Sequence, residues 1–468
     1  MMLARCTLGT MAIAALAGCT TFSPDGGRGE VERLAAERIG TPARVLTQPG
    51  DESARRTAVE ARLAEVLTAE SAVEIALLNQ PALQVRLAEL GLAEADLVQA
   101  GRLRNPVFAY SNKRHADVVE IERAVLVNVA ALVMMPLALD MGERRFAQAK
   151  LVAAADIVQA AGAVRQAWIR AVAAQERLVY DEQVMGAAEA ASELSRRMAE
   201  VDNFSKLAQM REHAFYADAA AALARSRHLA LAERERLARL LGLPDGGASL
   251  RLPPRLPDLP GTTLEGATSE QVAMDRRLDV RIATAEVESL ARSLGLTRTT
   301  RFVNVLEVGY ANTSATGESR ADGYEIELEL PLFDFGDAKV ARAEIRYRQA
   351  LAGAADVAVN ARSEVREAYS AYRTALDLAK HYRDEIVPLR RRIADEMLLR
   401  YNGMLAGVFD LLADARVQSA TVAASIDATR DFWLAESALQ LALAGRSSGA
   451  MPTLGRAASP AAEPAGGH

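Results

Sequence analysis

The sequence has few of the residues that build metal and catalytic sites. Its 468 residues include only two cysteines and five histidines. The histidines lack the spacing of a zinc site, and we find no glycine-rich phosphate loop and no Ser/His/Asp or Cys/His arrangement. We therefore expect a protein that is not an enzyme and that uses no metal and no cofactor.

Basic charge is also scarce. The formal net charge is −6, and no basic cluster with interleaved aromatic residues occurs along the chain. Nucleic acids select strongly basic surfaces, so we expect no nucleic-acid partner. Half of the residues are apolar and a quarter are charged, which is the composition of a folded protein.

The first 18 residues have the composition of a secretory leader. Arg5 precedes the apolar run TLGTMAIAALAG, which is too short to span a bilayer. The run leads into Cys19 through Leu-Ala-Gly, which is similar to the cleavage box of bacterial lipoproteins. We expect a signal peptide over residues 1–18, a lipid anchor with palmitate on Cys19 and, since Thr20 is not aspartate, sorting to the outer membrane. The alternative is an ordinary signal peptide with a chance cysteine. Cys6 leaves with the leader, so Cys19 has no disulfide partner.

Two halves of the chain repeat one pattern. The segment AVEIALLNQPALQVRLAELGLAEADLVQAGRLRNPVF begins at residue 72, and EQVAMDRRLDVRIATAEVESLARSLGLTRTTRFVNV begins at residue 270. Matching positions lie 197 residues apart: Ala76 and Ala273, Leu83 and Val280, Val85 and Ile282, Glu89 and Glu286, Leu97 and Leu294. Self-similarity over such a length indicates a tandem structural repeat, and we place its halves at 67–242 and 266–445.

Most of each half has a helical pattern. Apolar residues at helical spacing, with almost no proline or glycine, predict helices over about 69–103, 143–201, 204–242, 269–300, 338–401 and 405–445. The two longest would each measure about 90 Å at 1.5 Å per residue. Helices of that length favour coiled-coil packing over a globular core, so we expect long antiparallel helical hairpins.

Three segments lack this pattern. Residues 243–265 are rich in proline and glycine and predict an irregular linker between the repeats. Residues 19–66 are also expected to be irregular, and residues 446–468 are expected to form a disordered tail. Trp168 and Trp433 are expected to be packing residues.

Each half also contains one pair of strands. We expect strands near 105–112 and 123–137 in the first half and near 301–312 and 323–333 in the second. About ten residues per strand is the length that crosses a bilayer at a tilt of about 45°. Four strands cannot close a barrel, and a sheet in lipid tolerates no free edge. Three chains with four strands each would form a shared barrel of twelve.

The last strand alternates strictly. In GYEIELELPLFDFG (residues 323–336) the apolar residues Tyr324, Ile326, Leu328, Leu330 and Leu332 share one face, and Glu325, Glu327 and Glu329 share the other. In a barrel the carboxylates would face the pore, because charge is costly in lipid. The alternative is a soluble sheet with a solvated acidic face. Aligning Pro136 with Pro331 puts Ala130, Leu132 and Met134 at the three glutamate positions. Either the acidic stripe belongs to the second hairpin alone, or the first hairpin has another register.

Order and spacing together resemble a known family. The lipoprotein box, the tandem halves, the hairpin that ends in Pro-Leu-Phe-Asp-x-Gly (331–336) and the paired long helices are similar to the TolC-like outer-membrane efflux channels. The resemblance covers about residues 65–445. It implies a mainly α fold with a small β part, a homotrimer with a twelve-stranded barrel in outer-membrane lipid, and an α-helical tunnel in the periplasm. It also implies two partners, a periplasmic adaptor (membrane fusion) protein and an inner-membrane pump.

The resemblance also implies a gate at the periplasmic tip. The turns 202–205 and 402–406 would form this tip, and Tyr401, Asp410 and Asp414 lie where the family carries its gate residues. The family's latch arginine corresponds to Ala406 here, so a salt-bridge latch is not expected. The alternative is an ordinary solvated helix face.

Two function classes remain. The first is the exit duct of a tripartite efflux system, which passively exports small molecules or ions. The second is a lipid-anchored periplasmic adaptor or scaffold with coiled-coil hairpins. Duplicated strands of bilayer length favour the duct. The sequence does not identify the exported substrate.

Overall fold

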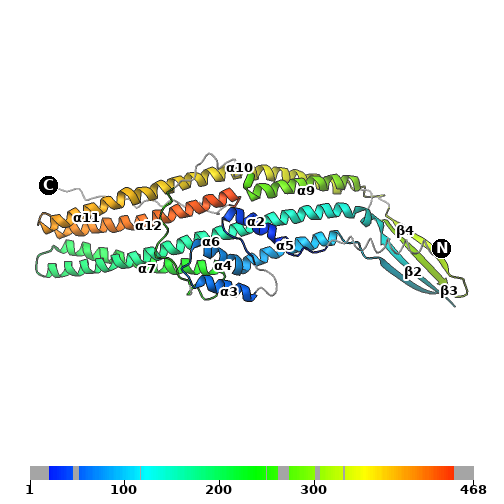
Figure 1. The fold of residues 1–468 in the computed structure, drawn as a ribbon, viewed down its shortest axis with the longest axis horizontal. Coiled ribbons are helices and arrows are strands. Elements are labelled where there is room, and N and C mark those ends of the chain that lie inside the picture. The colour runs from blue at the N-terminus through cyan, green and yellow to red at the C-terminus, as the bar shows by residue number, and fades with distance from the viewer. Residues whose placement is uncertain are drawn as a thin grey trace. The chain divides into compact units, whose positions relative to one another are not determined.

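The computed structural model describes residues 21–45, 52–115, 117–248, 250–261, 274–300, 306–329 and 332–446. The elements, in chain order (Figure 1), are α2 (Arg28–Ile39), α3 (Glu52–Leu63), α4 (Ala69–Asn79), α5 (Pro81–Ala100), β1 (Val107–His115), β2 (Val118–Asn128), α6 (Val129–Glu200), α7 (Lys206–Leu241), α9 (Leu278–Thr300), β3 (Leu306–Ala315), β4 (Ala321–Leu328), α10 (Asp337–His381), the π-helical turn η1 (Tyr382–Ile386), α11 (Val387–Asn402) and α12 (Val408–Ala444).

The chain divides into two compact units. The first unit contains residues 1–31, 85–154 and 278–359, and the second contains residues 32–84, 155–277 and 360–468. The long helices α6 and α10 contribute residues to both. Each unit contains residues from both halves of the tandem repeat, so the two halves do not fold as separate units. Among the described residues, no helix combines the length and the apolar character needed to cross a membrane.

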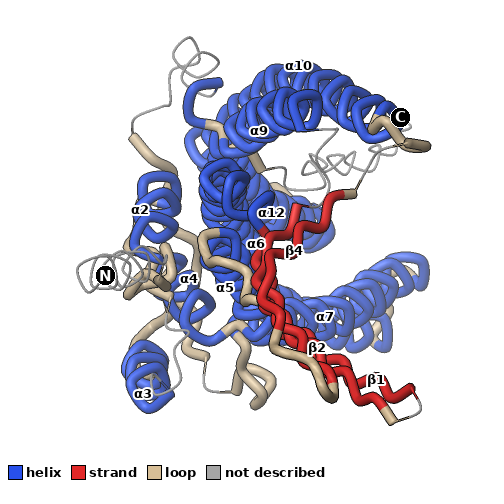
Figure 2. The backbone as a smooth tube through the Cα atoms, turned by 90° about the vertical axis from the view of Figure 1, so that its right-hand side faces the viewer, coloured by secondary structure: helices blue, strands red, loops and turns tan. Residues whose placement is uncertain are grey.

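The first unit carries one antiparallel sheet in the order β1-β2-β3-β4. The two hairpins, β1–β2 and β3–β4, come from the two halves of the sequence and meet where β2 pairs with β3. Figure 2 shows these strands as one continuous curved sheet. Gly309 of β3 lies at this junction, and a Cβ at this position would come within 2.6 Å of the Val125 carbonyl oxygen. A larger residue would therefore push the two hairpins apart.

The strand boundaries correct one expectation. The predicted strand over 123–137 is wrong beyond Asn128, because residues 129–137 form the start of α6. The prediction failed because VAALVMMPL is an apolar run without period, and such a run does not distinguish a strand from a helix. Conversely, residues 118–122 lie between the two expected strands but belong to β2. Ala130, Leu132 and Met134 are helical and have no place in the sheet.

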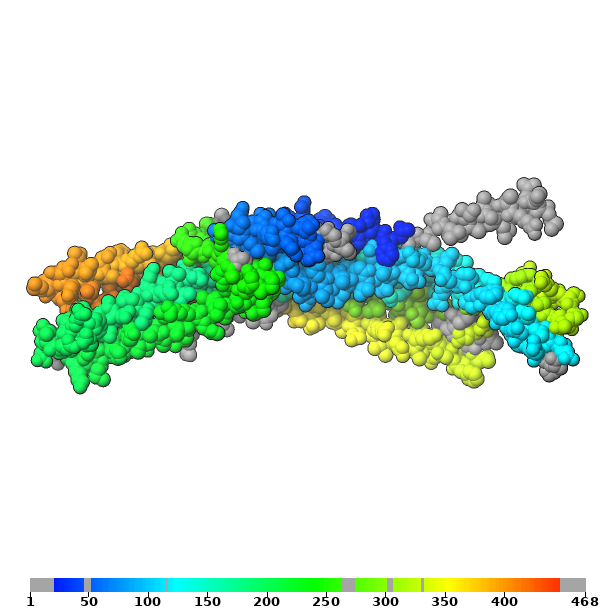
Figure 3. Space-filling view, turned by 90° about the horizontal axis from the view of Figure 1, so that it is seen from below, coloured from blue at the N-terminus to red at the C-terminus, as the bar shows by residue number. Residues whose placement is uncertain are grey.

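The second unit is built from helical hairpins. α6 runs beside α7 (Figures 1 and 3), and α11 runs beside α12 (Figure 1). The expected helix over 338–401 is divided by η1 into α10 and α11, and the expected helix over 69–103 is divided at Pro81 into α4 and α5. A proline within a helix removes a hydrogen bond and its ring clashes with the preceding turn, which accounts for the second division.

Small residues form the packing seam of this unit. One buried cluster joins α10 to α12 through a majority of alanine and leucine side chains: Val365, Ala368, Tyr372, Ala375, Leu376, Ala379, Phe432, Ala435, Leu439 and Ala442. α6 approaches α12 at Gly162, where a Cβ would overlap the Leu441 side chain. Alanine and glycine allow helix axes to come close, which extends dispersion contacts along the hairpins.

The segments expected to be irregular are partly helical. Residues 19–66 include α2 and α3, since both stretches are rich in the helix formers Ala, Glu, Arg and Leu. The described linker residues 250–261 contain no helix or strand, as expected. Hydrogen bonds to its carbonyl groups secure this linker: the Leu67 amide donates to the Arg251 carbonyl over 2.8 Å, and the Arg234 side chain donates to the Leu250 carbonyl over 2.7 Å.

Candidate functional site

One face of the sheet is an exposed apolar band. The register places Tyr324 opposite Tyr310 and Ile326 opposite Val308, and these continue through β2 and β1 as Val125, Val127 and Phe108. Their side chains are exposed, from 36% at Val308 to 89% at Tyr324. Exposed apolar patches of this extent mark contact with another apolar phase or partner.

The opposite face carries carboxylates. Glu325 and Glu327 lie on this face, and the register places Glu327 opposite Glu307. Glu307 in turn lies opposite Asn128, whose side-chain amide donates to the Glu307 carboxylate over 3.3 Å. Glu329 follows directly after β4 and is exposed. The predicted alternation therefore holds through β4, which ends at Leu328. Leu330 and Pro331 lie outside the described residues. Leu332 and Phe333 form a bend, so the strand expected to reach residue 333 is too long.

The acidic face extends into the first hairpin. On β2, Glu120 and Glu122 share the face of Glu307, since each alternate residue points to the same side. Lys113 of β1 lies on this face too and pairs with Glu122 over 3.2 Å. The expectation that the acidic stripe might belong to the second hairpin alone is thus wrong. It rested on Ala130, Leu132 and Met134, which are helical.

The two tip turns lie where the sequence predicts them. α6 ends at Glu200 and α7 begins at Lys206 after the N-cap Ser205, whose hydroxyl accepts from the Ala208 amide. α11 ends at Asn402 and α12 begins at Val408. Each turn contains one residue other than glycine in the left-handed region, Asp202 (φ 57°) and Met404 (φ 60°). This shared and uncommon conformation indicates that the repeat extends to the turns.

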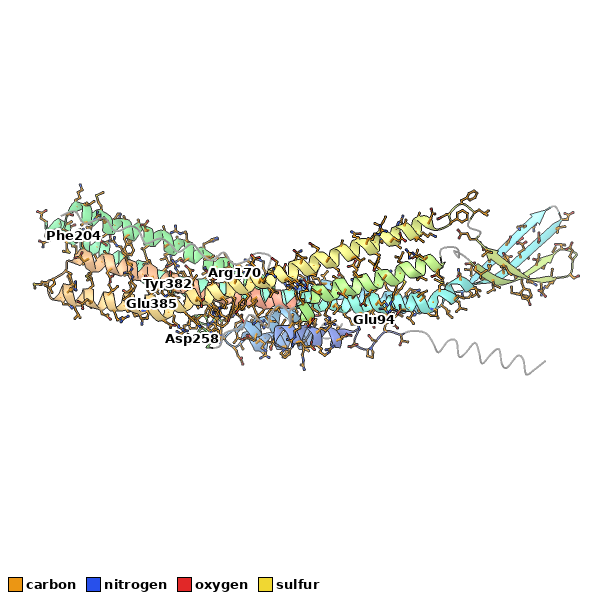
Figure 4. The ribbon with its side chains drawn as sticks, turned by 90° about the horizontal axis from the view of Figure 1, so that it is seen from above. Glu94, Arg170, Phe204, Asp258, Tyr382 and Glu385 are labelled. Carbon is orange, nitrogen blue, oxygen red and sulfur yellow. The ribbon has the colours of Figure 1, made fainter. Side chains whose placement is uncertain are left out.

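An aromatic contact joins the two turns. Phe204 precedes α7 and Phe409 lies in the first turn of α12, and their rings stack with centroids 4.5 Å apart and planes 5° from parallel. Figure 4 labels Phe204 at the end of its hairpin. Sequence reasoning missed this pair. The available signal was an aromatic residue beside each tip turn, in a chain with only 5% aromatics.

The predicted gate residues lie at the end of α11 and in the first two turns of α12. The Asp410 carboxylate accepts from the Gly407 amide over 3.0 Å, so it caps the start of α12 as well as lying exposed at the tip. Asp414 follows one turn later on the same helix. Tyr401 lies in the last turn of α11 and is 39% exposed. Ala406 lies in the turn before α12 and offers no charged group.

Charged side chains tie the hairpins together farther along. Arg416 of α12 pairs with Glu212 of α7, whose side chain is 1% exposed, and the Arg416 guanidinium lies 4.9 Å from the centre of the Phe215 ring. Arg177 of α6 pairs with Asp427 of α12 over 3.2 Å. These contacts lie on facing helices, so the two hairpins of this unit are coupled at several levels along their length.

Solved structures share this architecture. The CmeC outer membrane channel of Campylobacter jejuni aligns with a TM-score of 0.69 at 13% identity, over 89% of this chain and 92% of that one. The Vibrio cholerae outer membrane protein VceC aligns with a TM-score of 0.66 at 17% identity, over 82% and 97%. The MtrE outer membrane channel of Neisseria gonorrhoeae, in its open state, aligns with a TM-score of 0.59 at 16% identity, over 80% and 89%. This is the outer-membrane-channel fold.

The outer-membrane-channel fold confirms the predicted architecture of long helical hairpins with a small four-stranded sheet. It is a likeness of structure, since no protein-family model and no curated protein sequence matches the chain. In the part of the chain that is described, no cluster of three His, Cys, Asp or Glu side chains is arranged to hold a metal ion. Cys19 lies outside the described residues.

Proposed function

We propose that this chain is an outer-membrane channel that serves as the exit duct of a tripartite efflux system and passively exports small molecules or ions. The observation that carries the proposal is the division of the sheet into an exposed apolar band across all four strands and an opposite face that carries carboxylates on β2, β3 and β4. A barrel wall in lipid needs this division, with apolar side chains outward and polar ones inward. An adaptor or scaffold gives the apolar band no role.

The working assembly is a homotrimer. β1 and β4 are the edges of the sheet, and strand edges cannot remain unpaired in lipid. Pairing β4 of one copy with β1 of the next closes three copies into twelve strands. The acidic faces would then line one lumen, where several carboxylates per copy favour cations over anions.

The lipid anchor and the tip define the remaining contacts. Cys19 would carry acyl chains that hold the N-terminus in the outer membrane. At the other end, Met404 and Leu405 are 94% and 82% exposed and offer an apolar surface to a periplasmic adaptor, which links the duct to an inner-membrane pump. Rings of Asp410 and Asp414 at the tip would attract cations, and the Phe204–Phe409 stack would replace the salt-bridge latch that Ala406 excludes.

Cysteine accessibility tests the barrel orientation. Single cysteines at Tyr324 and Ile326 (apolar band) and at Glu325 and Glu327 (acidic face) are compared in isolated outer membranes with a water-soluble maleimide. Cys6 leaves with the leader and Cys19 is acylated, so the background is low. We expect modification at 325 and 327 and protection at 324 and 326, with protection lost after solubilisation in denaturant. Equal labelling of both faces in intact membranes would favour the soluble scaffold.

A further inference from the structure

Both tryptophans of the chain line one pocket in the second unit. The pocket has a volume of about 800 Å³, is open on one side and is lined by α6, α12, the start of α4 and the linker residues 253–258. We call it the indole pocket. The indole N–H of Trp168 donates to the Leu67 carbonyl over 2.8 Å, and that of Trp433 donates to the Pro257 carbonyl over 3.1 Å. Because both N–H groups are satisfied by the pocket's own walls, the rings are held in place.

The walls combine flat apolar surface with carboxylates. Pro253, Pro254 and Pro257 add apolar rings to the two indoles. Three acidic residues (Glu70, Asp258, Glu436) and two arginines (Arg165, Arg255) complete the lining, which leaves one net negative charge. Arg255 lies 3.6 Å from Asp258, and the Arg165 guanidinium donates to the Ile39 carbonyl. Arg255 is balanced by Asp258, whereas Arg165 keeps its charge and acts on Glu436, so Glu70, Glu436 and Arg165 together carry the one net negative charge.

Two polar groups on α12 are only partly satisfied. Ser437 is 4% exposed, and among the described residues its hydroxyl has no hydrogen-bond partner. Glu436 accepts a hydrogen bond from the Gln440 side chain, and burial raises the pKa of its carboxyl. A buried carboxylate gains most from a cation, and a buried hydroxyl from any hydrogen-bonding partner, because neither is fully compensated by the protein.

We propose that the indole pocket binds an amphipathic organic cation that carries an aromatic ring system. The partly exposed indole of Trp433 can attract a cation and stack on a ring, and the buried Trp168, 5% exposed, forms part of the wall. Glu436 and Glu70 neutralise the positive charge, while the prolines contact the remaining apolar surface. The volume fits a drug-sized molecule, since pockets for such ligands measure about 300–1,000 Å³. The site is lined by the linker, α12, α6 and the start of α4, and none of its lining residues belongs to the sheet or to the tip turns, so it is distinct from the acidic face and from the tip. The proposal does not depend on the duct function.

Tryptophan fluorescence reads this pocket directly. The chain has only two tryptophans and both line the pocket, so the whole tryptophan emission reports on it. The probe is N-methylacridinium, a water-soluble aromatic cation, added to the purified full-length protein at neutral pH. We expect saturable quenching, confirmed by equilibrium dialysis. Acridine-9-carboxylate, which carries the same ring system with a negative charge, is expected to give no saturable quenching.

Matched variants assign the recognition to the carboxylates. Glu436→Gln keeps the size and one acceptor oxygen, and it should weaken cation binding by at least about tenfold because it leaves the cation without its buried partner. Glu189→Gln, an exposed change on α6 outside this pocket, should bind as the unmodified chain does. Trp168→Phe and Trp433→Phe should each still show quenching through the tryptophan that remains.

Several outcomes would overturn the proposal. One is the absence of saturable quenching and of dialysis binding, as would follow if a neighbouring copy fills the pocket in the assembly. A second is equal binding of the cation and the anion. A third is unchanged cation affinity in Glu436→Gln. If Glu436→Gln does not fold, as judged by its thermal unfolding curve, Glu70→Gln takes its place, and unchanged affinity in that variant is equally decisive.

Discussion

The rings of Phe204 and Phe409 stack nearly parallel, with centroids 4.5 Å apart, and join the two tip turns of one chain. Stacked aromatic pairs contribute about 0.5–1.5 kcal/mol beyond area burial. Other ties between these hairpins, such as Glu212–Arg416, involve charged groups. The tip is therefore held by a contact that depends little on salt.

Removing this stack should loosen the tip. We predict that a double-mutant cycle with Phe204→Ala and Phe409→Ala gives a coupling free energy of about 0.5–1.5 kcal/mol in chemical unfolding. A cycle that pairs Phe409→Ala with Phe335→Ala, an exposed phenylalanine of the first unit, is the control and should give no coupling. Independent, additive effects of Phe204→Ala and Phe409→Ala would show that the stack holds nothing together.

The acidic face should set ion preference. Replacing Glu325, Glu327 and Glu329 together with glutamine removes negative charge from the proposed lumen and should shift the reversal potential in a salt gradient toward lower cation preference. This shift in reversal potential should be smaller at high salt, because counterions screen the carboxylates. Glu318→Gln in the turn between β3 and β4 is the matched control. Unchanged reversal potentials in the triple variant would contradict the assignment.

The buried ion pair between α7 and α12 should matter for stability. Arg416→Met leaves the Glu212 carboxylate buried without its partner, and we expect a loss of about 3–5 kcal/mol in the free energy of unfolding. Adding Glu212→Leu should recover most of that loss, since the unpaired charge is then gone. The exposed pair Arg33–Glu37 is the control, and Arg33→Met should cost no more than about 1 kcal/mol. Urea unfolding midpoints measure each value.

Glu436 should make stability depend on pH. Burial raises the pKa of its carboxyl above the value of about 4.5 that it has when unfolded, so the folded chain keeps this proton to higher pH. The contribution of this protonated carboxyl to folding stability is present in full below pH 4.5 and is lost as the pH rises through the folded-state pKa. Glu436→Gln removes this pH dependence. The free energy of unfolding of the variant should therefore rise relative to that of the unmodified chain between pH 4.5 and 7. A difference in unfolding midpoint that stays constant over this range would refute the prediction.

Local pattern was enough to predict part of the sheet. The strict alternation around Glu325 and Glu327 has period two, which assigns alternate residues to opposite faces once a strand forms. The prediction for the first hairpin was wrong because this alternation is missing there. Residues 129–137 are apolar without alternation, and the alignment of Pro136 with Pro331 then imposed a wrong register. A shift in register changes the face of every residue, so one wrong boundary removed Glu120 and Glu122 from the predicted acidic face.

Long-range contacts were beyond the sequence. The turns near Phe204 and Phe409 can be predicted from the sequence, because the helical pattern stops where each helix ends. Nothing local indicates that two rings 205 positions apart will stack. The indole pocket is similar: Trp168 and Trp433 were expected to be packing residues, and they do pack, but their shared cavity depends on how the linker crosses α6 and α12.

Planar-bilayer recording of the purified full-length protein tests the central claim most directly. We predict discrete, cation-preferring conductance steps, with a higher open probability for Phe204→Ala than for the unmodified chain. Because Phe204→Ala weakens the tip contact, the variant should conduct even if the unmodified channel stays closed. Absence of conductance from both, in every oligomeric state that can be purified, would contradict the account.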